Sequence, residues 1–148
     1  RRSRGLGDVY KRQIMVSSAE INEVTSIALL LFASCFFWIM AYDTAYALCD
    51  KEDDIGIGIN SSAIIFGDKV RLFFYSFHLV SLLILLSVAY QLDFHISFYI
   101  FASIALFLAT YQVFLIKGED SSKCLKAFKN NNWLGLSILI GSIAGVSL

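Results

Sequence analysis

The stretch VTSIALLLFASCFFWIMAYDTAYALC, residues 24–49, decides the fold class, because Asp43 is its only charged residue. An α-helix needs about 20 mostly apolar residues to cross the hydrocarbon core of a bilayer. This stretch is long enough to do so. It therefore predicts a transmembrane helix whose last turns carry a carboxylate.

Three further apolar stretches follow along the chain. Residues 72–92 and 96–116 contain no Asp, Glu, Lys or Arg, and the shorter stretch 131–148 is also uncharged. Hydrophobic residues make up 57% of the 148 residues and charged residues only 16%, against about 25% charged in soluble proteins. Segments such as LLILLSVAY lack the period-two alternation of barrel strands. The sequence predicts an all-α, polytopic transmembrane helical bundle with four transmembrane helices, at about residues 24–49, 72–92, 96–116 and 131–148.

The basic residues indicate how this bundle is oriented. They gather in two of the loops: Lys51, Lys69 and Arg71 after the first apolar stretch, and Lys117, Lys123, Lys126 and Lys129 after the third. Short cytoplasmic loops carry an excess of Lys and Arg, so both loops are expected to face the cytoplasm. The formal net charge is zero, which gives no basic field for nucleic acid, and no nucleic-acid partner is expected.

Three acids, Asp43, Asp50 and Asp54, mark the end of the first stretch. They lie seven and four residues apart, and at about 100° per residue they would share one face if the helix continued. Two carboxylates about 4 Å apart repel by roughly 4 kcal/mol at an effective dielectric of 20. Mg²⁺ prefers carboxylate and phosphate oxygens. The spacing thus favours a magnesium site, with the alternative of a solvated helix end left open.

The residues around these acids resemble a known family. The segment YDTAYALCDKEDDIGIGINSSAIIFG, residues 42–67, resembles the second aspartate-rich motif of the UbiA superfamily of intramembrane prenyltransferases. The YDTxYA lead-in and the GIxSxAIxFG trailer are closest to its 4-hydroxybenzoate polyprenyltransferase branch. KAFKNNNWLGL, residues 126–136, resembles the KAFxNNNxxGL stretch of the same branch.

The resemblance implies a reaction and its partners. It implies magnesium-dependent transfer of a polyprenyl group from polyprenyl diphosphate to the ring of 4-hydroxybenzoate, in ubiquinone biosynthesis. It also implies a protein surrounded by membrane lipid in the bacterial or mitochondrial inner membrane, with the aspartate motif facing the cytoplasm. Other branches prenylate other acceptors, such as another quinone precursor or haem. A non-enzymatic four-span membrane protein is a further alternative.

The same resemblance, read with the spacing, gives candidate site residues. We expect Asp50 and Asp54 to bind magnesium, Asp43 to support the site or the aromatic acceptor, and Lys51 to contact the diphosphate. The other candidates are Tyr46 as a catalytic residue and Ser61 and Ser62 as phosphate contacts. Gly56 and Asn60 stand where lysines are common in the branch, which is a departure from its pattern. His78, in the middle of a span, is expected to be packed and hydrogen-bonded rather than catalytic.

Family members have about twice this length and about nine helices. They carry another aspartate-rich motif, of the NDxxDxxxD kind, in their first half, and no residue here matches it. We therefore expect residues 14–148 to form the C-terminal half of a prenyltransferase domain, inactive alone. Residues 1–13, RRSRGLGDVYKRQ, carry five of the twelve basic residues without apolar periodicity, and we interpret them as a non-native leader.

Overall fold

The computed structural model describes residues 26–146, and every regular element in that range is a helix. The four long helices are α2 (Ser26–Cys49), α5 (Val70–Gln91), α6 (Ile96–Leu115) and α7 (Ser121–Val146). The short ones are α3 (Lys51–Ile57), α4 (Ser62–Phe66) and the 3₁₀ turns η1 (Gly67–Lys69) and η2 (Ile116–Gly118). The all-α prediction is confirmed over this range. The predicted leader lies outside the described residues.

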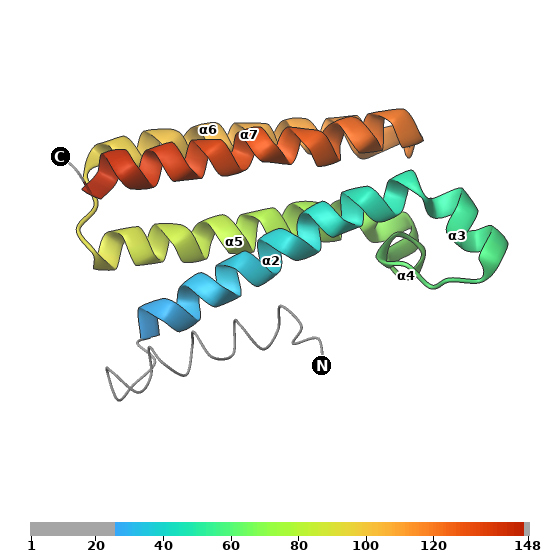
Figure 1. Ribbon diagram of the computed structural model, residues 1–148, viewed down its shortest axis with the longest axis horizontal. Helices are drawn as coiled ribbons and strands as arrows, with labels where there is room; N and C mark the ends of the chain where they lie inside the picture. Colours follow the sequence, from blue (N-terminus) through green and yellow to red (C-terminus); the bar gives the residue numbers. More distant parts are fainter. Residues whose placement is uncertain (1–25, 147–148) are drawn as a thin grey trace, which may run out of the picture.

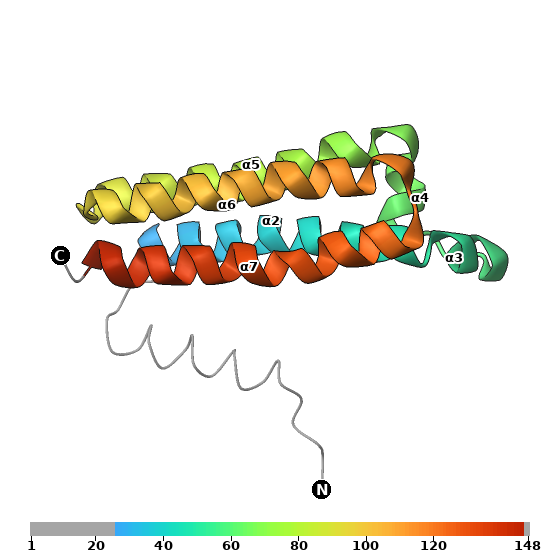
Figure 2. The ribbon, with the colours of Figure 1, turned by 90° about the horizontal axis from the view of Figure 1, so that it is seen from above.

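The four long helices form an antiparallel bundle. Figure 1 shows α6 and α7 side by side above α5 and α2. Figure 2, turned by 90°, shows α5 beside α6 and α2 beside α7. Each long helix therefore packs against two others, in the cyclic order α2, α5, α6 and α7.

Small residues allow these helices to approach closely. Alanines are prominent among the fully buried apolar side chains, and they occur in each of the three apolar clusters along the bundle. Where α6 crosses α7, a Cβ added at Gly141 would meet the Cβ of Phe101 at 2.7 Å. Small residues at helix contacts are typical of membrane bundles, where packing rather than water exclusion holds helices together.

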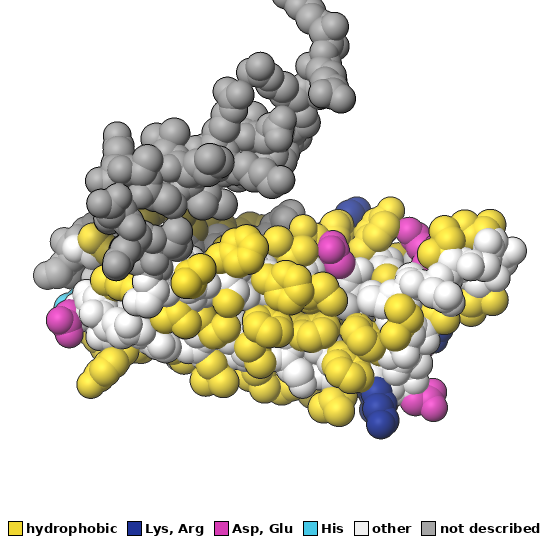
Figure 3. All heavy atoms as spheres, turned by 90° about the horizontal axis from the view of Figure 1, so that it is seen from below, with side chains coloured by type: hydrophobic (Ala, Val, Ile, Leu, Met, Phe, Trp, Pro, Cys, Tyr) yellow, Lys and Arg dark blue, Asp and Glu magenta, His cyan; other side chains and the backbone are white. Residues whose placement is uncertain are grey.

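The outer surface of the bundle is apolar. Phe32, Leu72, Phe107 and Phe114 are each more than 60% exposed, and Figure 3 shows hydrophobic side chains over much of one face, with charged side chains mainly toward its ends. Three helical segments are long and apolar enough to cross a membrane: Ser26–Cys49, Ser62–Gln91 and Ile96–Gly118. The exposed apolar surface is what a lipid environment requires.

The fourth predicted span lies within α7. The structure starts this helix at Ser121, ten residues before the predicted start at 131, so that Lys123, Lys126 and Lys129 occupy its first turns. All three lysines are exposed. By length and composition, α7 is not among the three segments that qualify as spans within residues 26–146. Its helical state is confirmed, and its role as a fourth span stays a prediction.

Both basic loops lie at the same end of the bundle. Figure 1 places α3 and α4, which follow α2, at the end where α6 turns into α7. The connection between α5 and α6 lies at the opposite end. The shared end agrees with the predicted topology. Which side of the membrane it faces stays a prediction.

Candidate active site

The acid cluster lies at the junction of α2 and α3. Between the end of α2 at Cys49 and the start of α3 at Lys51, Asp50 adopts a conformation outside the helix, with φ −101° and ψ 8°. The helix is therefore interrupted at Asp50, and the shared face of Asp43, Asp50 and Asp54 stays a prediction. The Asp54 amide still donates to the Asp50 carbonyl at 2.9 Å, so those two residues remain one turn apart.

Tyr46 lies against Asp50 on this junction. Its hydroxyl lies next to the Asp50 carboxylate, and its ring packs on Phe128 of α7 with centroids 5.3 Å apart. Tyr42 meets the same Phe128 ring at 5.8 Å. Phe128, from the KAFKNNN stretch, thus holds two tyrosines of α2. Asp43, between them, is exposed on a helix with no other charged residue.

Asp50 and Asp54 are the predicted metal ligands. Both residues are partly buried. Among residues 26–146, no group of three or more His, Cys, Asp or Glu side chains is placed to hold a metal. Mg²⁺ commonly binds one or two carboxylates and takes its remaining oxygens from water and phosphate. The pair therefore fits an ion whose coordination a diphosphate completes, and it does not fit a closed protein cage.

The segment after the acids is more ordered than the predicted loop, because α3 and α4 occupy much of it. Gly58 ends α3 in the left-handed conformation with φ 75°, which glycine adopts without strain. Ser61 precedes α4 and Ser62 is its first residue. The Ser61 hydroxyl is buried and makes no hydrogen bond within the described residues. The role of Ser61 and Ser62 as phosphate contacts stays a prediction.

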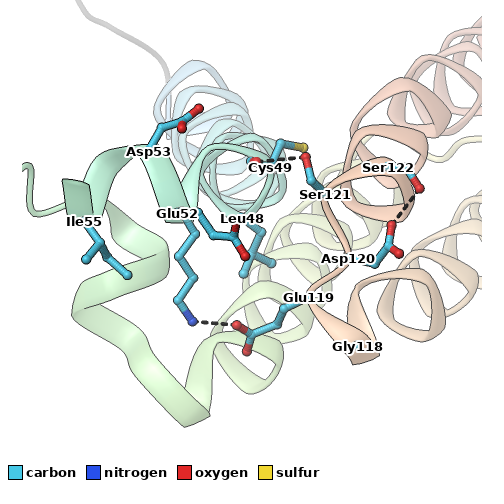
Figure 4. Close-up of a pocket in the computed structure, with 11 residues that line it drawn as sticks. Leu48, Cys49, Glu52, Asp53, Ile55, Gly118, Glu119, Asp120, Ser121 and Ser122 are labelled. Atoms are coloured by element: carbon cyan, nitrogen blue, oxygen red, sulfur yellow. Dashed lines mark hydrogen bonds and ion pairs between the residues drawn. The ribbon is translucent and has the colours of Figure 1, made fainter. Parts of the chain in front are cut away.

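A hollow of about 780 Å³ lies between α3 and the turn from α6 to α7. Lys51 and Glu119, which both line this hollow, form an ion pair with Nζ and Oε2 2.5 Å apart. Figure 4 marks this pair with a dashed line at Glu119. The Ser121 hydroxyl donates to the Cys49 carbonyl at 2.9 Å beside it. The hollow is lined by Lys51 but by none of the other predicted site residues. Lys51, which directly follows Asp50 in the chain, thus lines a hollow that the magnesium candidates do not line.

Two titratable groups near the hollow have shifted pKa values. Asp120 accepts hydrogen bonds from the Ser122 hydroxyl at 2.6 Å and the Lys123 amide at 3.1 Å, and these bonds lower the pKa of its carboxyl. Burial raises the pKa of the Cys124 thiol to about 11. Cys124 therefore stays protonated at neutral pH, which makes it a poor metal ligand.

Residues 14–137, which include the acid junction and the segment after it, match the model of the UbiA prenyltransferase family. The chain is a member of that family. It is 35% identical over 144 residues to a protein of Pseudomonas aeruginosa (strain LESB58) named 4-hydroxybenzoate octaprenyltransferase. A Shewanella protein (strain ANA-3) of the same name is 39% identical over 137 residues.

This UbiA family chain spans about half the length of the curated relatives it matches. The alignments cover 97% and 92% of the chain but 49% and 48% of the Pseudomonas and Shewanella proteins. No solved structure matches the chain. The family match begins at residue 14, whereas the 144-residue alignment reaches into residues 1–13. The non-native origin of that segment stays a prediction.

Within this UbiA fold, Ser61 and Ser62 lie at the start of α4, and the other predicted site residues form two groups. Tyr46 and Asp50 are in contact, with Asp54 one turn further and Asp43 one turn before Tyr46 on α2. Lys51 lies in the hollow with Glu119, a partner that was not predicted from the sequence. The only feature of the sequence that indicated the Lys51–Glu119 pair was the prediction that both basic loops lie at the same end of the bundle. The catalytic and metal-binding roles stay predictions.

Proposed function

We propose that this chain supplies one half of the active site of an enzyme that prenylates 4-hydroxybenzoate in ubiquinone biosynthesis. The relatives named 4-hydroxybenzoate octaprenyltransferase, which align with 92% or more of the chain, are the observation that carries this proposal. The contact of Tyr46 with Asp50, at the end of an apolar helix, supports it.

The metal would be magnesium, held by Asp50 and Asp54. When bound, it neutralises charge on the diphosphate and so makes a better leaving group. The acids themselves repel a diphosphate, so they would oppose substrate binding without a cation between them. In this proposal the Tyr46 hydroxyl, which lies next to Asp50, donates a hydrogen bond that orients this carboxylate and leaves its other lone pairs for the ion.

The reaction exchanges one bond to an allylic carbon for another. The carbon–oxygen bond breaks and the diphosphate leaves with the electron pair. The same carbon then bonds to the ring carbon ortho to the phenol of 4-hydroxybenzoate, and the ring releases a proton. Asp43 is exposed on α2, and in this proposal it supports the acceptor or the acid site.

The diphosphate needs cationic and hydrogen-bonding contacts from this half of the enzyme. Lys51 supplies the cationic contact after its ion pair with Glu119 breaks. Ser61 and Ser62 supply the hydrogen bonds. Gly56 and Asn60 are exposed and uncharged, so they add no cationic contact. The apolar helix walls hold the isoprenoid chain and exclude water from the reacting carbon.

The membrane setting follows from the apolar helices and the basic loops. The three apolar segments make the protein an integral membrane protein. We place it in the bacterial or mitochondrial inner membrane, with the acid end facing the cytoplasm, because that end carries both Lys- and Arg-rich loops.

A chimera tests the function directly. The N-terminal half of the Pseudomonas relative is joined to residues 14–148, and membranes containing it are given magnesium, polyprenyl diphosphate and 4-hydroxybenzoate. We expect prenylated 4-hydroxybenzoate from the chimera and none from the 148-residue chain alone. Product with another aromatic acceptor but not with 4-hydroxybenzoate would overturn the acceptor assignment.

A further inference from the structure

Trp38 of α2 is hydrogen-bonded to Asn131 of α7. The indole Nε1 donates to the Asn131 Oδ1 at 2.8 Å. Asn131 is only 9% exposed, and it belongs to the NNNWLGL stretch, for which the proposed reaction has no use. This bond links α2 to α7 through two residues that are 93 positions apart in the chain.

The same indole lies directly over Gly135. A Cβ added at Gly135 would meet two ring carbons of Trp38, at 2.8 and 3.0 Å. Real Cβ atoms do not approach so closely, so the ring occupies space that any other residue would fill. Asn131 and Gly135 are one turn apart on α7 and together form a site for the indole, here called the Trp38 socket.

A third helix meets the socket. His78 of α5 is 1% exposed, and the Asn131 side chain lies next to its ring. The His78 Nδ1 bonds the Phe74 carbonyl at 3.1 Å, while its Nε2 makes no hydrogen bond within the described residues. Polar side chains are costly inside a membrane bundle and usually serve a function there.

We propose that the Trp38 socket fixes the axial position of α2 against α7 and so positions the acid-bearing end of α2. Apolar contacts would let α2 slide along α7. The Asn131 hydrogen bond and the gap above Gly135 fit the Trp38 indole at only one position along α7. A slip of one turn would move Asp43 and Asp50 by about 5.4 Å. Trp38 and Asn131 are thus positioning residues, and only their consequence for prenyl transfer rests on the proposed function.

The chain contains its own reporters of this position. Cys49, at the end of α2, is partly buried, and Cys124 in α7 is fully buried. With the exposed Cys35 replaced by Ser, the rate of maleimide labelling at Cys49 reports displacement of the α2 end. Cys124 is buried in the apolar cluster against which Cys49 packs, so its labelling reports opening of that cluster. Neither rate depends on enzyme activity, so failure of the proposed reaction leaves this test intact.

Two variants change the Trp38 socket, and a third changes a neighbouring residue outside it. Trp38→Phe keeps an aromatic ring and removes the N–H donor, while Asn131→Leu removes the acceptor. Asn132→Leu, at the exposed neighbouring position, is the matched control. In the full 148-residue chain, in detergent micelles, we expect both socket variants to raise Cys49 labelling at least about threefold, with Cys124 labelling unchanged.

Three outcomes of the labelling experiment would overturn the proposal. The proposal is overturned if Cys49 labelling does not rise, if Cys124 labelling rises equally, or if Asn132→Leu has the same effect. Should Asn131→Leu fail to fold, Gly135→Ala tests the same contact. We expect Gly135→Ala to raise Cys49 labelling with Trp38 present and to have less effect combined with Trp38→Leu. Equal effects in both backgrounds would contradict the socket.

Discussion

Lys51 Nζ and Glu119 Oε2 lie 2.5 Å apart and join α3 to the turn between α6 and α7. Their side chains are 26% and 37% exposed. Ion pairs this accessible to water contribute about 0–1 kcal/mol. The pair is therefore weak enough to release Lys51 to a stronger anion, such as the diphosphate we propose for it.

Substitution of Lys51 and substitution of Glu119 should have different effects on the KM for polyprenyl diphosphate. In the chimera, Lys51→Ala should raise the KM for polyprenyl diphosphate roughly tenfold, because a charged hydrogen bond of about 1.5 kcal/mol is lost. Glu119→Gln should leave this KM within about twofold of the parent, since it removes only a weak competitor. If Glu119→Gln raised KM as much as Lys51→Ala, Lys51 would act through Glu119 and not on the substrate.

Tyr46→Phe tests the hydroxyl that faces Asp50. The ring contact with Phe128 remains, so thermal unfolding should hardly change. Turnover by the chimera should fall about tenfold, because Asp50 loses the bond that orients it. Tyr42→Phe is the control, since Tyr42 packs on the same Phe128 ring. Equal turnover in the two variants would remove Tyr46 from the site.

Gly141→Ala tests the close approach of α6 and α7. The new methyl group would lie 2.7 Å from the Cβ of Phe101, and overpacking of this kind costs about 1–3 kcal/mol of unfolding free energy. Gly118→Ala is the control, because a Cβ there meets nothing within 4 Å. Denaturant unfolding in micelles measures both. A Gly141→Ala chain as stable as the control would contradict the packing.

Asp120 gives α7 a pH-dependent start. The pKa of the Asp120 carboxyl is lowered in the folded chain by hydrogen bonds from Ser122 and Lys123. The ionised carboxylate therefore stabilises the folded chain fully at neutral pH. This stabilisation is lost as the pH falls from the ordinary Asp pKa through the lowered one. Asp120→Ala should lower Tm at pH 7, and the difference from the parent should shrink in acid. Asp120→Asn should lose less, because its amide oxygen still accepts. A constant difference across pH would contradict this account.

The apolar stretches predicted the long helices well, because helices in lipid must satisfy their own backbone. α6 begins at the predicted residue, 96, and ends at 115, one residue before the predicted end. The start of α7 was missed, because three lysines interrupt the apolar pattern. The Asp120 side chain accepts from the Lys123 amide three residues on, which is a helix-start signal visible in the sequence.

The junction at Asp50 could not be predicted from local sequence. Neither Pro nor Gly marks it, and the acids follow helical spacing through it. The Ser121 hydroxyl bonds the Cys49 carbonyl, an acceptor that a continuing helix would use. Glu119 holds Lys51 at the same place. Both contacts come from about 70 residues away, so only the folded bundle brings them to the acids.

The most direct test of the central claim compares three aspartate variants of the chimera. With magnesium and both substrates, the parent and Asp53→Asn should form prenylated 4-hydroxybenzoate, because Asp53 is exposed and is not one of the residues proposed to hold the metal or the diphosphate. Asp50→Asn and Asp54→Asn should each lose at least about 100-fold in turnover, or roughly 2.7 kcal/mol of transition-state stabilisation. Near-parental turnover in both variants would contradict the claim that these carboxylates hold the metal and the diphosphate.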